Sequence, residues 1–362
     1  MTDPFAFLAA RGPIVDATTP KAWLQAMLDV EAALAAAQAE VDVIPLGAAE
    51  VIAEACNAER FDVVGIFEEA ALGGVPVIGL VEHLRGAVDR DFAAHVHRGA
   101  TSQDIMDTAA MVIVARCADL AAAQLDAAAD LVDRLAAARG ATPMIGRTLG
   151  QFAVATTFGN VTSRWRTGLH DASEALRSSA AALPVQLGGP VGDGASLGAD
   201  SMIAVGVAER LRLVSPGHSW HTVRGPIARI AGVWGLAATA VSAVATQIVS
   251  LAASDVGELH ERAAGAGGSS SMAHKHNPIA AISARAAAMQ VPGLVSTLLT
   301  AAGGHEFERA AGSWHAEWPA LNAMLRATGS AIGWLETSLQ RITVDPERMV
   351  ANLAAAGAER TP

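Results

Sequence analysis

Apolar residues recur at helical spacing along most of the chain. In the segment 21–41, for example, Trp23, Met27, Val30 and Leu34 fall on one face of a helix. Breaks that contain glycine or proline separate this segment from others with a similar pattern. Further helices are predicted at residues 47–56, 60–72, 77–94, 102–139 and 279–302, with one opening at Arg147 and a last one ending at Arg341. The pattern therefore predicts an all-α fold.

Residues 230–254 form an apolar segment without a single charge, long enough to span a bilayer. The segment is rich in alanine, threonine, serine and glycine rather than leucine and isoleucine, and it contains Gln247. A helix that is apolar on all sides is also typical of the centre of a large bundle. We therefore expect a buried helix and no membrane partner.

The composition narrows the class of protein. Hydrophobic residues make up 52% of the chain and charged residues 17%, while aromatic residues are 4% and tyrosine is absent, which favours closely packed, alanine-rich helices. The formal net charge of -11 argues against nucleic acid as a partner. Cys56 and Cys117 are expected to be reduced thiols, and the N-terminus has no signal-peptide pattern. These features predict a cytoplasmic protein.

The segment 265–279 reads GAGGSSSMAHKHNPI and differs from everything around it. Its glycines allow close approach of the backbone to a ligand, and its serines supply hydroxyl groups. Lys275 adds a positive charge, Asn277 an amide, and Pro278 fits the first turn of the following helix. These parts suit a mobile loop that closes over an anion. The alternative, a flexible Gly/Ser linker, does not need the Met-x-x-Lys-x-Asn-Pro continuation.

This loop resembles the signature G-S-S-x-M-x-x-K-x-N-P of the fumarase/aspartase superfamily. Ala273 stands where many members have proline. The resemblance implies that Ser269 and Lys275 are catalytic, that Ser270 and Asn277 bind substrate, and that neither a metal nor an organic cofactor takes part. The matching residues are Gly268, Ser269, Ser270, Met272, Lys275, Asn277 and Pro278.

A second polar segment precedes the predicted helix 102–139. Thr101 and Asp104 match a capping box, and the N-terminus of a helix is also a site where anions bind. The segment resembles the T-S-x-D motif of the superfamily, which implies that His97, Thr101 and Ser102 contact the substrate. For His97 a purely structural role remains open.

A third segment, beginning at Arg147, reads RTLGQ. Members that act on adenylosuccinate carry R-T-H-G-Q here, with histidine in acid/base chemistry, whereas this chain has Leu149. The resemblance implies that Thr148 and Gln151 contact the substrate, although Gln151 also fits an ordinary helix start. The glycine-rich segment 186–198 lacks the features of a phosphate-binding loop and is expected to be a tight connection near the site.

Two further regions carry candidate chemistry. Arg224 and Arg229 flank the start of the uncharged helix and are candidates either for carboxylate binding or for a solvated helix end. The run ERAAGSWHAEW at 308–318 resembles the 3-carboxy-cis,cis-muconate cycloisomerases, which implies a substrate-binding role for Arg309. Members carry histidine where this chain has Phe307. Trp314 and Trp318 are expected to pack in the core.

The resemblance covers nearly the whole chain and implies a domain organisation. We expect an N-terminal helical domain at 1–97, a long central bundle at 98–341 and a short tail at 342–362, without the C-terminal domain of full-length relatives. Four bundles are expected to associate around the uncharged helix, with each site shared between subunits. The homotetramer would act on a small tricarboxylate.

The implied reaction is lactonisation of 3-carboxy-cis,cis-muconate to 4-carboxymuconolactone in protocatechuate degradation, through an aci-carboxylate that a general acid protonates. Three alternatives remain. Leu149 disfavours an adenylosuccinate lyase, and the run that contains both tryptophans disfavours an argininosuccinate- or aspartase-like lyase. A non-catalytic structural member of the fold would not need Ser269, Lys275 and Asn277.

Overall fold

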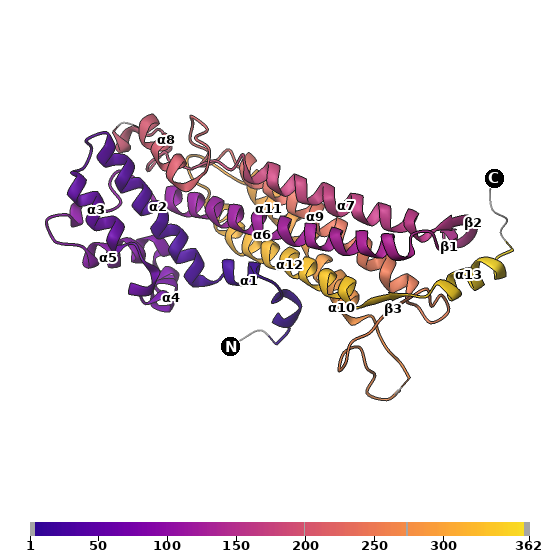
Figure 1. Cartoon of the computed structure of the whole chain (residues 1–362). Helices are drawn as coiled ribbons and strands as arrows, with labels where there is room; N and C mark the ends of the chain where they lie inside the picture. Colours follow the sequence, from indigo (N-terminus) through magenta and orange to yellow (C-terminus); the bar gives the residue numbers. More distant parts are fainter. Residues whose placement is uncertain (1–3, 199, 273, 358–362) are drawn as a thin grey trace.

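The computed structural model describes residues 4–198, 200–272 and 274–357, so Ala273 lies outside the described residues. The molecule is an elongated helical bundle with a cluster of shorter helices at one end (Figure 1). Its elements are η1 (Ala6–Ala9), α1 (Ile14–Ala17), α2 (Pro20–Glu40), α3 (Leu46–Ala55), η2 (Ala58–Arg60), α4 (Val63–Gly73), α5 (Pro76–Ala87), η3 (Ala93–His95), α6 (Ser102–Arg139), β1 (Pro143–Thr148), β2 (Gln151–Thr157), α7 (Phe158–Ala180), η4 (Ala195–Leu197), α8 (Asp200–Leu211), α9 (Gly225–Leu251), β3 (Leu259–Glu261), α10 (Ile279–Ala288), α11 (Val291–Gly303), α12 (Ser313–Arg341), β4 (Ile342–Val344) and α13 (Pro346–Ala355).

The N-terminal cluster consists of α2 to α5, with α8 packed against α2 (Figure 1). Thr19 caps α2 by accepting a hydrogen bond from the backbone of Ala22, and Pro20 occupies the first turn, where its missing N–H costs nothing. The boundary at residue 97 stays a prediction. Because α8 comes about a hundred residues after α5, the cluster combines N-terminal helices with one helix from the middle of the chain.

The bundle is built from α6, α7, α9, α10, α11 and α12. The core is rich in alanine, with fully buried Trp165, Trp220 and Trp234 as its largest side chains. Small side chains let helices approach closely, so long helices form despite modest individual amphipathicity. The predicted all-α class and the helix 102–139 are confirmed.

The helix predicted to open at Arg147 is wrong. Residues 143–157 form an antiparallel β-hairpin at the far end of the bundle (Figure 1). Its two-residue turn, Leu149 and Gly150, has φ of 52° and 79°. Positive φ at both positions is typical of a type I′ turn, whose twist matches the flanking strands. A Leu-Gly pair is a weak signal for such a turn, so the pattern did not reveal it.

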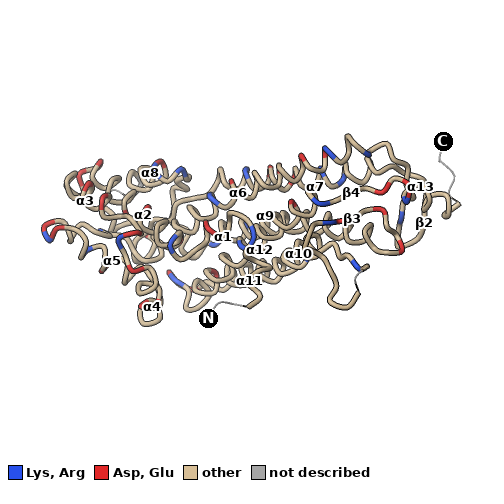
Figure 2. Tube along the Cα trace, turned by 60° about the horizontal axis from the view of Figure 1, so that its bottom comes forward, with Lys and Arg blue, Asp and Glu red and all other residues tan. Residues whose placement is uncertain are grey.

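Two helical stretches are long and apolar enough to cross a membrane by length and composition alone, Gly225–Leu251 and Ile279–Gly303. Core helices pass the same test, so this is weak evidence for a membrane. The second stretch is interrupted between α10 and α11, just before Pro292, as the sequence predicts. Figure 2 shows almost no charge along α9 and α11.

Candidate active site

The three polar segments singled out from the sequence lie far apart within one chain (Figure 1). His97 and Thr101 precede α6, whereas Thr148 follows it in the hairpin beyond its other end. With 38 residues, α6 is about 57 Å long at 1.5 Å per residue. The chain therefore does not bring these two segments into one cavity.

The signature loop also lies far from the start of α6. Its base is held where Ser338 Oγ donates to Glu261 Oε2 at 2.6 Å, whereas Trp314, near the other end of α12, bonds to Asp107 of α6. Residues 314 and 338 of one helix are separated by about 36 Å. Figure 1 shows the loop projecting from the bundle between β3 and α10.

At the start of α6, the predicted capping box is confirmed, because Asp104 Oδ2 accepts from the Thr101 backbone N–H at 3.0 Å. Arg309 also reaches this helix end. Its Nη2 donates to Thr101 Oγ1 at 2.7 Å and its Nε to Gln103 Oε1 at 3.1 Å. The segment before α12 is thereby joined to the half-buried Thr101–Ser102 pair, which suits one anion-binding corner.

His97 lies beside this corner in a left-handed backbone conformation, with φ of 61°. Its Nδ1 is 2.6 Å from Glu31 Oε1 of α2. Burial alone would lower the pKa of His97, but the charge and hydrogen bond of Glu31 raise that pKa above its ordinary value. The structure thus gives His97 a partner in the fold, and its contact with substrate stays a prediction.

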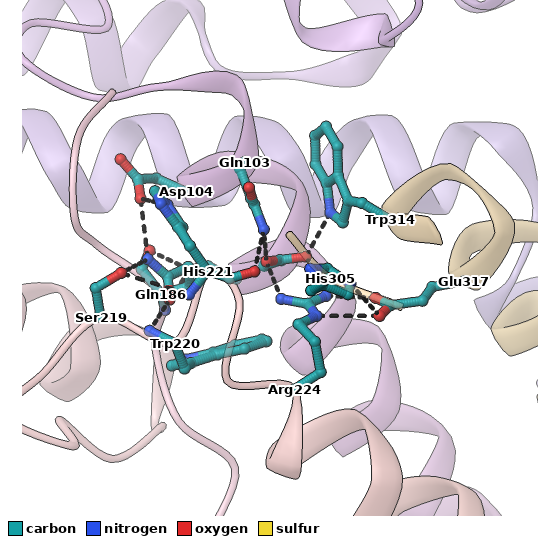
Figure 3. A network of polar contacts seen from close by, with 12 residues as sticks. Gln103, Asp104, Gln186, Ser219, Trp220, His221, Arg224, His305, Trp314 and Glu317 are labelled. Carbon is teal, nitrogen blue, oxygen red and sulfur yellow. Dashed lines mark hydrogen bonds and ion pairs between the residues drawn. The ribbon is translucent and has the colours of Figure 1, made fainter. Parts of the chain in front are cut away.

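The glycine-rich segment 186–198 is held at the start of α6 by Asp104, which Figure 3 shows beside Gln186. Asp104 is fully buried and accepts from the backbone N–H groups of Gly188 at 2.8 Å and Gly189 at 2.9 Å. His221 Nε2 lies 3.0 Å from Asp104 Oδ1. One carboxylate therefore fixes both the helix start and the loop, which explains why it tolerates burial.

The prediction of a solvated helix end for Arg224 was wrong, and the carboxylates that it binds belong to the protein itself. The uncharged helix starts one residue later, at Gly225, and Arg224 is buried between two carboxylates (Figure 3). Its guanidinium donates to both oxygens of Asp107, at 2.6 and 3.0 Å, and to Glu317 Oε1 at 3.0 Å. Burial opposes its charge, but Asp107 and Glu317 raise the pKa of Arg224, so it stays charged. Arg229 is exposed, as expected for a solvated helix end.

Sequence reasoning missed this buried network. Asp104, Asp107 and Glu317 are acidic residues inside apolar helical segments, and such residues are almost never buried without partners. That pattern was the available signal. The partners themselves, Arg224 and His305, come from distant parts of the chain and could not be paired from sequence.

The signature loop is open and exposes its candidate groups. Lys275 and Ser270 are exposed, and Ser269 is half-buried. Ser269 Oγ accepts from the backbone N–H of Met272 at 3.2 Å and thus closes a short turn. Asn277 Nδ2 donates to Gly267 O at 3.1 Å, so this amide joins the two arms of the loop. Its predicted contact with substrate stays a prediction.

The loop is anchored firmly at its base. Glu261 accepts from the backbone N–H groups of Ala280 at 2.8 Å and Ala281 at 3.1 Å, which are free donors in the first turn of α10. Gly267 has φ of 73°, and a Cβ there would lie 2.3 Å from Asn277 O, so only glycine fits. A fixed base with an exposed tip suits a segment that closes over a ligand.

The hairpin exposes Thr148 and Gln151, which pair with each other across the turn. Leu149 at the tip is fully exposed, at 101%. Behind the tip, Arg147 Nη2 donates to the buried Glu258 Oε1 at 2.8 Å and fixes the hairpin to the bundle. Within residues 4–198, 200–272 and 274–357, no group of three His, Cys, Asp or Glu side chains could hold a metal ion.

Fold and site together define a helical-bundle protein with three widely separated polar segments, each held by buried acidic residues. A model of the lyase family matches residues 7–293. The chain is 41% identical to a nitrosuccinate lyase from Streptomyces davaonensis, over 96% of this chain and 76% of that protein. It is 38% identical to a 3-carboxy-cis,cis-muconate cycloisomerase from Bradyrhizobium diazoefficiens, over 92% of this chain and 75% of that protein.

The solved structures agree. The 3-carboxy-cis,cis-muconate lactonizing enzyme from Pseudomonas putida has a TM-score of 0.90 and 33% identity, and the match covers 97% of this chain and 79% of that one. The chain therefore belongs to the lyase family of the fumarase/aspartase superfamily, as its signature loop predicts. The family and its members support a lyase-type enzyme.

Proposed function

We propose that this protein makes or breaks a bond at the carbon β to a substrate carboxylate. We propose that its reaction is the lactonisation of 3-carboxy-cis,cis-muconate. The observation that carries the proposal is the signature loop, which presents Ser269, Ser270 and Lys275 on a base fixed by Glu261. The similarity to cycloisomerases, at 38% identity for one of them, supports the choice of substrate.

In this reaction, one carboxylate oxygen attacks an alkene carbon and forms the C–O bond of the lactone. The alkene electron pair moves toward a second carboxylate and produces an aci-carboxylate. Lys275 and loop N–H groups stabilise that charge, and Ser269 donates a proton to the adjacent carbon. The serine then recovers its proton from solvent.

A second candidate is elimination from nitrosuccinate, favoured by 41% identity to a nitrosuccinate lyase. The same loop groups would first remove a proton from the carbon beside one carboxylate and stabilise the resulting aci-carboxylate, whose electron pair then breaks the C–N bond. Nitrite leaves, and fumarate remains. Both candidates share the carboxylate-stabilised intermediate, but lactonisation is an addition in which a proton is donated, whereas nitrite release is an elimination in which a proton is removed.

Purified protein decides between the two reactions. Loss of 3-carboxy-cis,cis-muconate absorbance and release of nitrite from nitrosuccinate are measured in parallel, with adenylosuccinate as a third substrate. We expect the muconate to have the highest kcat/KM. Faster nitrite release would establish the second candidate, and adenylosuccinate cleavage or no turnover of either acid would contradict the proposal.

We further propose a cytoplasmic homotetramer whose sites combine residues of several subunits. The wide separation of His97, Thr148 and Ser269 in one chain supports shared sites. Exposed Leu236, Met289 and Leu299 on and near α9 and α11 support an apolar interface there. Light scattering at micromolar concentration should give four times the chain mass, and a monodisperse monomer would contradict it.

Shared sites have a separate test. Ser269→Ala and Arg309→Met should each be inactive as homotetramers. After the two are mixed and reassembled, some sites receive both intact residues, and activity should return. No recovery in a verified mixed tetramer would place both residues in the same chain's site.

A further inference from the structure

A cleft of about 900 Å³ lies between α2, α6, α7 and the end of α8, on a part of the bundle that none of the three polar segments occupies. Its floor is formed largely by alanines of these helices. Four arginines line it against two aspartates, in a protein with a formal net charge of -11. The charged lining residues are Arg116, Arg177, Arg210, Arg212, Asp29 and Asp119.

Three of these arginines have carboxylate partners, but all three pairs are at least partly exposed. Arg177 pairs with Asp126 and Arg210 with Glu40, and the arginine side chains are 44% and 30% exposed. Arg210 lowers the pKa of Glu40 by its hydrogen bond and charge. Exposed ion pairs contribute little to stability, so these guanidiniums can turn toward a ligand at small cost.

Arg212 differs from the others. It is exposed, and none of the described carboxylates lies within ion-pair distance of it. Its guanidinium therefore has no ion-pair partner among the described residues, although Asp119 lines the same cleft. Arg116, by contrast, is 2.7 Å from Asp29.

The backbone of Arg212 is also unusual. It has φ of 56° just after α8, where Leu213 N donates to Ala208 O at 2.9 Å and Arg212 N to Glu209 O at 3.3 Å. These two bonds form a Schellman motif, whose left-handed position is normally glycine. An arginine at such a position is strained, and strain of this kind is concentrated at functional sites.

We propose that this arginine cleft binds a small polyanion, with carboxylate or phosphate groups held by Arg212 and at least one neighbouring arginine. A guanidinium presents paired donors that match both kinds of group. The alanine floor leaves room for the body of the ligand. The cleft is separate from the candidate active site, because Arg116 lies about 21 Å along α6 from Ser102.

Isothermal titration calorimetry tests the proposal with succinate, citrate and inorganic phosphate as probes. All proteins carry Ser269→Ala, so that turnover plays no part. We expect saturable binding in this parent and affinity that falls about tenfold or more in Arg212→Gln, because a charge-assisted contact is lost. Citrate binding without phosphate binding would identify a carboxylate site, and the reverse a phosphate site.

Two further variants separate binding from folding. Arg134→Gln removes an exposed arginine of the same α6 that does not line the cleft, and it should leave affinity unchanged. Arg212→Gly should weaken binding while it raises the melting temperature, since glycine accepts positive φ without strain. The proposal is overturned if no probe binds saturably, or if Arg212→Gln and Arg134→Gln bind alike.

Binding is measured without turnover, so this outcome is independent of the proposed reaction. An anion held only at the active site would bind equally to both arginine variants. That result would leave the proposed function intact and remove the arginine cleft as a site.

Discussion

Replacement of Ser269 by alanine tests the assignment of the general acid. Loss of a general acid should lower kcat by roughly 10²–10⁴-fold, or about 3–5 kcal/mol of barrier. The structural cost should be far smaller. Among the described residues, Ser269 Oγ accepts from Met272 N at 3.2 Å and, weakly, from Ser271 N at 3.4 Å, in an exposed loop. Such a contact is worth about 1 kcal/mol.

The assay is steady-state lactonisation of 3-carboxy-cis,cis-muconate, with kcat and KM determined separately. Ser269→Ala should lose kcat with KM near normal, because a contact made equally in ground and transition states would change KM instead. Ser271→Ala is the matched control. Ser271 is exposed and occupies the variable position of the signature, so its variant should stay within a few-fold of the parent.

The opposite result has a clear meaning. If Ser271→Ala is inactive and Ser269→Ala is active, the register assigned to the loop is wrong. The roles proposed for Lys275 and Asn277 would then need reassignment as well. A uniform rise in KM for Ser269→Ala would make Ser269 a binding residue.

Three further predictions follow from the structure. Arg224→Met should lower the free energy of unfolding in urea by about 3–5 kcal/mol, because two buried carboxylates lose their counter-charge, and a change below about 1 kcal/mol would contradict this. Leu149→His should leave stability unchanged, because Leu149 is fully exposed in one chain, and should create no adenylosuccinate cleavage; it should lower lactonisation by placing a polar ring in the proposed shared site, and unchanged activity would mean that Leu149 does not face substrate. Because Glu31 raises the pKa of His97, their pairing stabilises the fold fully below the unfolded pKa of about 6.5 and is lost as pH rises through the raised pKa. The stability difference between parent and His97→Gln should therefore shrink from about pH 5.5 to about pH 8.5.

The signature loop shows what a local pattern can establish. Gly267 must be glycine because the arms of the loop approach closely there, and Asn277 bridges the two arms. The residue types at these positions therefore follow from the local geometry. The same holds for the capping box of α6 and for the break before Pro292. Each of these features depends on neighbours within ten residues along the chain.

The hairpin at 143–157 shows where a local pattern misleads. Arg147 has the appearance of a helix start, yet its guanidinium is held by Glu258, more than a hundred residues away. Leu149 and Gly150 take left-handed conformations that neither residue demands. Local propensity is a weak prior, and tertiary contacts override it.

The sequence by itself determined the helical class, the family and the candidate loop, because helical periodicity, caps and signature residues are encoded over short stretches. Only the tertiary structure decided the role of Arg224, which the sequence left open between carboxylate binding and a solvated helix end and which neutralises Asp107 and Glu317 from two other helices. It also decided that one chain holds its polar segments tens of ångströms apart. The physical reason is that burial, charge pairing and distance depend on how distant parts of the chain pack together. No single stretch of sequence contains that information.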